Sequence, residues 1–378
     1  MSSSLRIGVD GHAFRSPAGG VRRYVLEIYQ RLSQTPGIEV IAIGAEAADD
    51  LPPAIARRSA TRFPTNLGWT ALSLPLSVRG ASVDVFHAPA YTAPLWGVHP
   101  QAVTIHDVSY ERVPEWNAYK NDRARRWFYR RSARAADRVI TDSEFSRGEI
   151  AAAYGIDSAR IDVVPLAAAA AFTPGAFDPS LAPPRVRQPY VLHVGDLQVR
   201  RNLKTALTAV LRLRKAARRA EPADDFTAGV SIVCSGVDRG IGVDLNVQAG
   251  GAGDMDALVL TGAVTDAALV NLYRGAAALV YPSRYEGFGL PLLEAMQCGV
   301  PVIAAKAASM PEVIGSAGLL VDPLDVAAWE AALRDVLWSA RRAEELGAAS
   351  LARAAEFSWD RTAQETLKIL RACAGSRR

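Results

Sequence analysis

The segment Tyr281–Ala305 carries two carboxylates whose spacing suits a grip on one elongated ligand. Glu286 lies in a glycine-rich loop that follows an expected strand, and Glu294 lies in the first turns of an expected helix at about Pro291–Cys298. A helix rises about 1.5 Å per residue, so the two carboxylates cannot share one proton as a tight pair. Carboxylates accept hydrogen bonds from vicinal diols, such as those of a sugar or a ribose.

The glycines of this loop support a binding role. Gly287 and Gly289 let the backbone approach a ligand, and the N–H groups at the helix start favour an anion or sugar hydroxyls. The alternative is a plain strand–turn–helix with a solvated Glu286 and a capping Glu294. That alternative is disfavoured by the glycines and Pro291 taken together.

A pair of arginines offers a site for phosphate. The stretch Tyr190–Leu203 ends a strand at Gly195 and opens a helix near Asn202, so Arg200 and Arg201 stand beside a helix N-terminus. Guanidinium groups pair bidentately with phosphate oxygens. Two solvated arginines are the alternative in a chain this rich in arginine.

The first half of the chain holds further candidates. Gly19 and Gly20, between Ser16 and Tyr24, can bring backbone N–H groups to a phosphate, although a tight turn would use the same pair. His106 stands at a strand carboxyl end, where ligands collect in parallel sheets. His87 also ends a strand and is a second candidate, for an acceptor.

Two β-α-β series must position these residues. Strands are expected at the following ranges: Arg6–Asp10, Glu39–Gly44, Ala102–Asp107, Arg138–Asp142, Ile161–Pro165, Tyr190–Val194, Val230–Cys234, Ala257–Thr261, Ala278–Tyr281, Val300–Ala304 and Gly318–Val321. We therefore predict an α/β fold with two doubly wound parallel sheets, Rossmann-like, facing each other across a cleft. The Ala- and Pro-rich stretch from Leu166 to Gln188 predicts a linker. The predicted domains are 1–175, completed by the helix 358–378, and 189–357, with 176–188 between them.

Bulk properties exclude several classes of protein. A chain of 378 residues with 22% charged residues is expected to form two globular domains. A net charge of +4 gives no bulk attraction to nucleic acid. Three scattered cysteines predict free buried thiols, and neither a signal segment nor a long apolar run is apparent, so we expect a cytoplasmic protein.

The run E-G-F-G-L-P-L-L-E, Glu286 to Glu294, resembles the E-x7-E motif of the retaining glycosyltransferases of family 4, which have the two-domain GT-B fold. Pro282–Ser283, Gly299–Val302 and Pro311–Pro323 resemble the flanks of that motif, and the resemblance extends to both halves of the chain. Four other stretches look most like bacterial mannosyl- and related hexosyltransferases of surface polysaccharide assembly: Val9–Phe14, Gly19–Tyr24, His106–Asp107 and Ser143–Arg147.

The resemblance implies roles for individual residues. Glu286 would contact the donor sugar, Glu294 the ribose, and the backbone at Phe288–Leu290 the sugar and phosphates. His106 would face the donor sugar, and the loop with the glycine pair would close on the donor phosphates. The family usually has a lysine where this chain has Arg201. The expected catalytic residues are Glu286, His106, Arg200 and Arg201. The expected donor-binding residues are Gly19, Gly20, Gly195, Val264, Glu286, Gly287, Phe288, Gly289, Leu290 and Glu294.

No metal or cofactor is expected. Asp254–Met255–Asp256 has the D-x-D spacing that holds a divalent cation in other glycosyltransferases. It precedes a strand at its amino end, which is the wrong end for ligands, so we interpret it as a solvated turn. No His, Cys or Asp cluster has metal spacing.

The stretch Arg123–Arg138 predicts a basic helix with seven arginines around Trp127, Phe128 and Tyr129. Arg123, Arg126, Arg130 and Arg134 share one helical face. Such a helix suits an anionic membrane surface, which would place the protein at the inner face of the cell membrane. A helix of a soluble domain with core aromatics and solvated arginines is the alternative, and the sequence leaves both open.

The predicted function is transfer of a hexose from a nucleoside diphosphate sugar to a glycan or lipid-linked acceptor, with retention at the anomeric carbon. We favour GDP-mannose over a UDP-hexose as the donor. An epimerase or phosphorylase of the same fold and an inactive sugar-nucleotide-binding protein are the alternatives. A phosphorylase would need a pyridoxal-binding lysine, whose context is not apparent, and the intact Glu286, Glu294 and His106 argue against an inactive protein.

Overall fold

The computed structural model forms two compact units, and each is an α/β body with one parallel sheet. The first comprises Met1–Leu166 and Ser358–Arg378, and the second comprises Ala167–Phe357. The residues that the structure describes are 4–16, 19–45, 48, 51–60, 63, 65–113, 116, 122–220, 222 and 224–375.

The first unit has a seven-stranded parallel sheet with the order β3-β2-β1-β4-β5-β6-β7. Its strands are β1 (Leu5–Asp10), β2 (Ile38–Ile43), β3 (Ala56–Arg58), β4 (Val85–Ala88), β5 (Gln101–Thr104), β6 (Arg138–Thr141) and β7 (Ile161–Val163). Its helices are α1 (Gly19–Leu32), α2 (Asn66–Gly68), α3 (Leu74–Arg79), α4 (Ser109–Arg112), α5 (Arg123–Ala135), α6 (Glu144–Tyr154) and α15 (Trp359–Gly375). The strand order reverses between β1 and β4, which marks the position where such sheets collect ligands.

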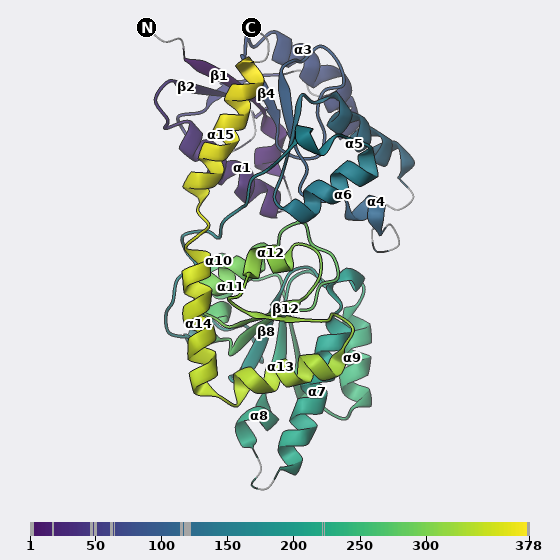
Figure 1. The fold of residues 1–378 in the computed structure, drawn as a ribbon, viewed down its shortest axis with the longest axis vertical. Helices are drawn as coiled ribbons and strands as arrows, with labels where there is room; N and C mark the ends of the chain where they lie inside the picture. The colour runs from purple at the N-terminus through teal and green to yellow at the C-terminus, as the bar shows by residue number, and fades with distance from the viewer. Residues whose placement is uncertain are drawn as a thin grey trace. The chain divides into compact units, whose positions relative to one another are not determined.

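The last helix of the chain belongs to this first unit. α15 packs beside α1 and against β4, β5 and β6 (Figure 1). The spacing of apolar residues predicts a helix over Val21–Leu32 with one apolar face, formed by Tyr24, Val25, Ile28, Tyr29 and Leu32. All five are at most 1% exposed in α1. The periodicity of the sequence therefore identified the face of α1 that packs into the core.

The second unit has a six-stranded parallel sheet with the order β10-β9-β8-β11-β12-β13. Its strands are β8 (Tyr190–Val194), β9 (Ser231–Ser235), β10 (Leu258–Gly262), β11 (Ala278–Tyr281), β12 (Val302–Ala305) and β13 (Leu319–Val321). Its helices are α7 (Leu203–Arg219), α8 (Asp225–Gly229), α9 (Gly242–Gly251), α10 (Asp266–Gly275), α11 (Leu290–Gln297), α12 (Met310–Ile314), α13 (Val326–Leu337) and α14 (Ala340–Ala354). The predicted pair of doubly wound parallel sheets is confirmed.

Two local expectations were wrong. The stretch interpreted as a linker packs into the second unit, where Phe172 is buried edge-on against Tyr273 and the backbone of Asp178 pairs with the Asn271 amide. The Ala- and Pro-rich composition predicted the lack of regular structure but not this burial. The edge strand β3 was not expected, because its three residues, Ala-Arg-Arg, are all exposed and carry no alternation of apolar and polar side chains.

The Asp254 side chain is not solvated. It is 9% exposed and accepts two hydrogen bonds of 2.7 Å from the Arg214 guanidinium, while Arg218 lies 2.9 Å away. The pair joins α7 to the turn before β10 and is a structural ion pair. Among the described residues, no group of three or more His, Cys, Asp or Glu is arranged to hold a metal ion.

Candidate active site

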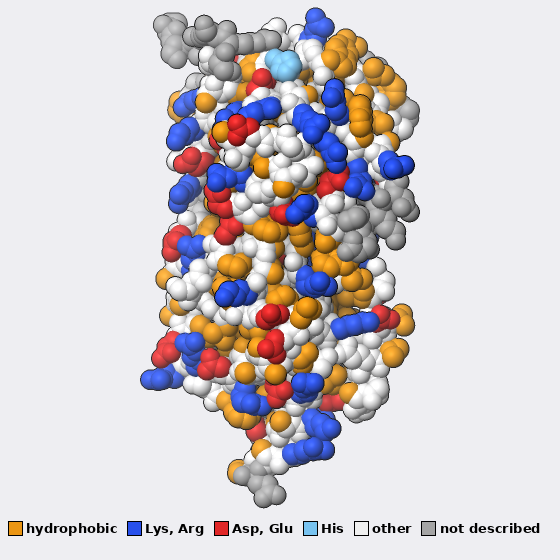
Figure 2. Space-filling view, turned by 45° about the vertical axis from the view of Figure 1, so that its right-hand side comes forward, with side chains coloured by type: hydrophobic (Ala, Val, Ile, Leu, Met, Phe, Trp, Pro, Cys, Tyr) orange, Lys and Arg blue, Asp and Glu red, His pale blue; other side chains and the backbone are white. Residues whose placement is uncertain are grey.

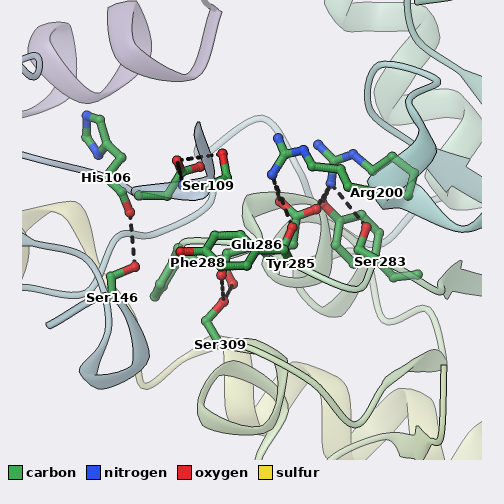
Figure 3. A network of polar contacts seen from close by, with 12 residues as sticks. His106, Ser109, Ser146, Arg200, Ser283, Tyr285, Glu286, Phe288 and Ser309 are labelled. Carbon is green, nitrogen blue, oxygen red and sulfur yellow. Dashed lines mark hydrogen bonds and ion pairs between the residues drawn. The ribbon is translucent and has the colours of Figure 1, made fainter. Parts of the chain in front are cut away.

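A glycine turn after β11 forms the centre of the site in the second unit. Gly289 has a φ of +107°, which glycine adopts without strain, and it precedes the first turn of α11, where Pro291 lies. A Cβ at Gly289 would stand 2.9 Å from Leu292 Cδ1. Ser309 supports the loop, since its hydroxyl shares its proton between the carbonyls of Glu286 (3.0 Å) and Phe288 (2.8 Å) (Figure 3).

The carboxylate of Glu286 is held by two arginines from the loop after β8. Arg201 donates to Glu286 Oε1, to the Tyr281 hydroxyl and to Ser283 Oγ, and Arg200 Nη1 lies 3.8 Å from Glu286 Oε2 (Figure 3). Glu286 is 6% exposed and Arg201 is 9% exposed. Burial opposes the charge of Arg201, but the Glu286 carboxylate outweighs it and raises the pKa of the guanidinium.

Sheet register explains why residues far apart in sequence meet here. β8 pairs in parallel with β11, with Leu192 opposite Leu279, so the loops that follow the two strands leave the sheet side by side. Arg200 links the two loops, because its guanidinium donates to the Tyr285 carbonyl at 3.1 Å. Both arginines therefore lie between the carboxyl end of β8 and the N-terminus of α7, as predicted, and neither is simply solvated.

Gly195 makes room for Arg201. It has a φ of +131°, and a Cβ there would stand 3.1 Å from Arg201 Nη2. His193 lies two residues before Gly195 and is fully buried. Its ring stacks on Tyr281, and its Nδ1 is 3.2 Å from the Val280 carbonyl. Burial and the Arg201 charge lower the pKa of His193 to about 3, so the ring stays neutral beneath the arginine.

Glu294 occupies a second buried position on α11. It is 5% exposed, and its Oε2 accepts a hydrogen bond of 2.8 Å from the Tyr273 hydroxyl. Glu294 and Glu286 thus have separate partners, in agreement with the expectation that they do not share a proton. Val264 lies in the loop between β10 and α10 and is partly exposed.

In the first unit, His106 pairs with a carboxylate that the sequence analysis did not single out. His106 Nδ1 lies 2.8 Å from Asp142 Oδ2. Ser146 Oγ donates to the His106 carbonyl at 3.1 Å, as Figure 3 shows. Burial opposes the charged ring, but Asp142 outweighs it and raises the pKa of His106. One feature of the sequence could have identified this carboxylate: Asp142 directly follows a strand.

His87 does not fit the acceptor role considered for it. The side chain is fully buried, with Nδ1 bonded to the Tyr29 hydroxyl at 2.6 Å and Nε2 to Thr104 Oγ1 at 2.8 Å. Burial lowers the pKa of His87 to about 3. Both ring nitrogens are satisfied inside the core, so this histidine is structural.

The glycine pair near the N-terminus begins α1 instead of preceding it. Gly19 is the first helical residue and Gly20 the second, and Gly20 is exposed with open space where a Cβ would stand. The first N–H groups of a helix have no partner within it, so the pair can still offer donors to an anion. Pro17 and Ala18 of the same loop lie outside the described residues.

The sequence matches two family models that between them cover both halves of the chain. Residues 18–168 match Glycosyltransferase Family 4, and residues 188–338 match Glycosyl transferases group 1. The chain is 30% identical to the O-antigen chain mannosyltransferase B of Escherichia coli over 93% of its own length and 95% of that protein.

Solved structures show the same fold. The sucrose-phosphate synthase of Thermosynechococcus elongatus superimposes with a TM-score of 0.76 at 19% identity, covering 98% of this chain and 100% of the other. The HepE protein of Anabaena, solved with UDP and glucose, has a TM-score of 0.72 at 18% identity, covering 98% and 100%. With the paired glutamates after β11 and the sequence match over nearly the whole chain, these findings show that the protein belongs to glycosyltransferase family 4 and has the GT-B fold.

Proposed function

We propose that this glycosyltransferase moves mannose from GDP-mannose to a glycan or lipid-linked acceptor in polysaccharide assembly, with retention at the anomeric carbon. The observation that carries the proposal is the Glu286 carboxylate, held by Arg200 and Arg201 beside the N-terminus of α11. A fixed carboxylate next to fixed cations and helix N–H groups suits a ligand that joins sugar hydroxyls to a diphosphate.

The two arginines have different tasks in this proposal. Arg201 is the buried counter-ion that keeps the Glu286 carboxylate in place for the sugar hydroxyls. Arg200 has a more exposed side chain, at 16%, and is the better placed to meet the pyrophosphate leaving group. Stabilising the charge that develops on a leaving group is commonly the largest catalytic contribution.

The remaining candidates complete the donor site. Glu294 takes the ribose hydroxyls, and the backbone of Gly287–Leu290 approaches the sugar and phosphates. In the first unit, Gly19 and Gly20 offer N–H groups to the phosphates, and His106 takes the donor sugar. The choice of mannose rests on the similarity to the O-antigen mannosyltransferase, which also suggests a surface polysaccharide as the product.

A panel of GDP- and UDP-sugars tests the donor. GDP-mannose at a hundredfold excess over its Kd is expected to stabilise the protein by about 2.7 kcal/mol, seen as a rise in Tm, with UDP-sugars giving a smaller rise. Release of GDP together with an α-linked mannoside should then require an acceptor. A larger rise with a UDP-hexose would overturn the choice of donor. Conversion of the sugar without acceptor would indicate an epimerase, and binding without turnover an inactive protein.

Transfer is expected to proceed without a divalent cation. Arg200 and the N-terminus of α11 are proposed to supply the positive charge that a metal ion supplies elsewhere. The initial rate should therefore be the same in millimolar EDTA as in millimolar MnCl₂. Complete loss of activity in EDTA with recovery in manganese would contradict this and return attention to Asp254 and Asp256.

We also propose that the first unit binds an anionic membrane, through a surface that differs from the expected arginine face. Arg126 and Arg130 pair with Glu111, and Arg134 donates to the Tyr154 carbonyl. These three arginines therefore make contacts within the first unit. Trp127 is 57% exposed on α5. The neighbouring exposed apolar residues are Leu67, Leu72, Leu76 and Trp96, and exposed arginines on α5 are Arg123 and Arg131.

Two contacts connect parts of this proposed surface. Trp96 Nε1 donates to the Ala71 carbonyl at 2.8 Å, and Leu67 shares a small cavity of about 140 Å³ with Arg125 and Phe128 of α5. Figure 2 shows hydrophobic side chains gathered at the upper right, next to Lys and Arg side chains. Apolar side chains beside cations suit the interface of an anionic bilayer. No helix among the described residues is long and apolar enough to cross one.

Vesicle flotation tests the membrane surface. Binding is expected to need anionic lipid and to weaken with salt, and Arg123→Ser with Arg131→Ser should weaken it about 30-fold, at about 1 kcal/mol per cation. Leu72→Ser with Leu76→Ser should also release the protein. Val243→Ser with Val247→Ser removes exposed apolar side chains of the second unit and serves as the control. Failure of the unmodified protein to float with anionic vesicles would contradict the proposal.

A further inference from the structure

Asp142 is buried at the end of β6 and has no role in the function described so far. Its Oδ2 is bonded to His106 Nδ1 at 2.8 Å, while Asp142 Oδ1 and His106 Nε2 are buried without a hydrogen-bond partner in the part of the chain that the structure describes. We propose that Asp142 is a positioning residue for His106, which keeps a proton on Nδ1 and thereby reserves Nε2 for the donor. This inference rests on the proposed function, since it assigns Asp142 a part in donor turnover.

The register of the first sheet dictates this pairing. β5 lies parallel to β6 with Thr104 opposite Ile140, so residues two positions further along each chain, His106 and Asp142, leave the sheet together. The contact between Ile105 N and the Ile140 carbonyl, at 2.9 Å, extends the pairing to the residue before the histidine. An aspartate at this position is therefore presented to the histidine by backbone geometry alone.

Other contacts fix the orientation of the ring. The Tyr24 ring meets it edge-on with centroids 4.9 Å apart, and the Tyr91 ring does so at 5.9 Å. Ser146 Oγ holds the backbone carbonyl of His106 at 3.1 Å. Nδ1 is bonded to Asp142, and Nε2 is the ring nitrogen without a hydrogen-bond partner in the described part of the chain. Because buried polar atoms are rarely left without a partner, Nε2 is the atom that can serve a ligand.

The charged groups around the ring favour its protonated form. Asp142 faces it from β6 and Asp107 from its own loop, and both raise the pKa of His106, as does the backbone of Pro89. His87, from β4, also faces the ring, but burial and the His106 charge lower the pKa of His87 to about 3, so it adds no charge. Burial raises the pKa of Tyr24, so its hydroxyl is neutral. A raised pKa means that the charged ring persists to higher pH and is lost as the pH rises through that value.

The experiment follows the His106 ring by nitrogen NMR and follows transfer against pH. Asp142→Asn should lower the titration midpoint of His106 by about 1–3 pH units, because a nearby opposite charge is lost. The alkaline limb of the kcat/KM profile should move with it, so that transfer falls tenfold or more at pH 7.5 and recovers at lower pH. Asp142→Glu keeps the charge and should retain most of the activity.

Asp107→Asn is the matched control, since Asp107 is a second carboxylate near the ring whose Oδ1 is engaged by Ser109. It should move the midpoint less than Asp142→Asn does. An unchanged tautomer and midpoint in Asp142→Asn would overturn the positioning role, as would a uniform loss of activity with no shift in the pH profile. The titration needs no donor, so a lack of transfer with every nucleotide sugar would count against the proposed function alone.

Discussion

Glu286→Ala is expected to remove nearly all hexose transfer while the variant still binds nucleoside diphosphate. Arg201 and Arg200 hold the Glu286 carboxylate in place, and in the proposed function this carboxylate binds the hydroxyls of the donor sugar. Losing a preorganised electrostatic contact to the reacting group costs roughly a hundredfold to a thousandfold in kcat. Steady-state kinetics measure the loss of transfer, and calorimetric titration with nucleoside diphosphate measures the retained affinity.

Two companion variants make the result specific. Glu286→Ala leaves the buried Arg201 without its carboxylate, so Glu286→Gln, which keeps the shape of the side chain, separates loss of charge from loss of packing. Glu294→Ala should have the opposite profile, with nucleotide affinity reduced about tenfold to a hundredfold, as expected when a charged hydrogen bond to the ribose is lost. Equal losses of nucleotide affinity in Glu286→Ala and Glu294→Ala would contradict the division of roles.

Asp254→Asn is expected to destabilise the second unit by about 3 kcal/mol without affecting nucleotide binding. Arg214 is 4% exposed, and its guanidinium donates two hydrogen bonds of 2.7 Å to Asp254. Breaking one side of a buried ion pair leaves the other charge uncompensated, which is strongly destabilising. Hydrogen exchange of peptides from α7 and β9 should show protection reduced roughly a hundredfold.

The stability lost in Asp254→Asn, relative to the unmodified protein, depends on pH. Burial alone would raise the pKa of Asp254, but the hydrogen bonds and charges of Arg214 and Arg218 outweigh it and lower that pKa. The stabilisation is thus present above the ordinary carboxyl pKa and is lost as the pH falls through the lowered value. Asp256→Asn changes an exposed neighbour and should have little effect. Equal destabilisation by the two variants would show that the ion pair is not the cause.

Local patterns in the sequence predicted the parts of the site that are themselves local. The loop from Glu286 to Gly289 and the start of α11 follow from glycine, proline and the strand before them, and the family resemblance added the assignment of Glu294. The predicted boundaries of α11 differ from the observed ones by one residue at each end. These features depend on neighbours within about ten residues, which composition and spacing report directly.

The side-chain partners could not be predicted, because sheet register brings them together. Arg201 meets Glu286 across 85 positions, and His106 meets Asp142 across 36. The burial of His87 and Asp254 likewise depends on what packs over them. A single sequence does not state which strands are neighbours, so a histidine at a strand end looked the same whether it faced the core or a ligand.

The position of α15 at the end of the chain has a consequence during synthesis. The helix buries Trp359, Thr366 and Leu370 within the first unit, yet the ribosome makes it only after all of Ala167–Phe357. Synthesis proceeds at about 5–20 residues per second, so roughly 10–40 s pass between the synthesis of Leu166 and that of α15. During this time the surface of the first unit over β4–β6 is not covered by α15. A chaperone acting on the nascent chain would meet that apolar surface first, and a ribosome stalled before Ser358 would hold a first unit that cannot complete its core.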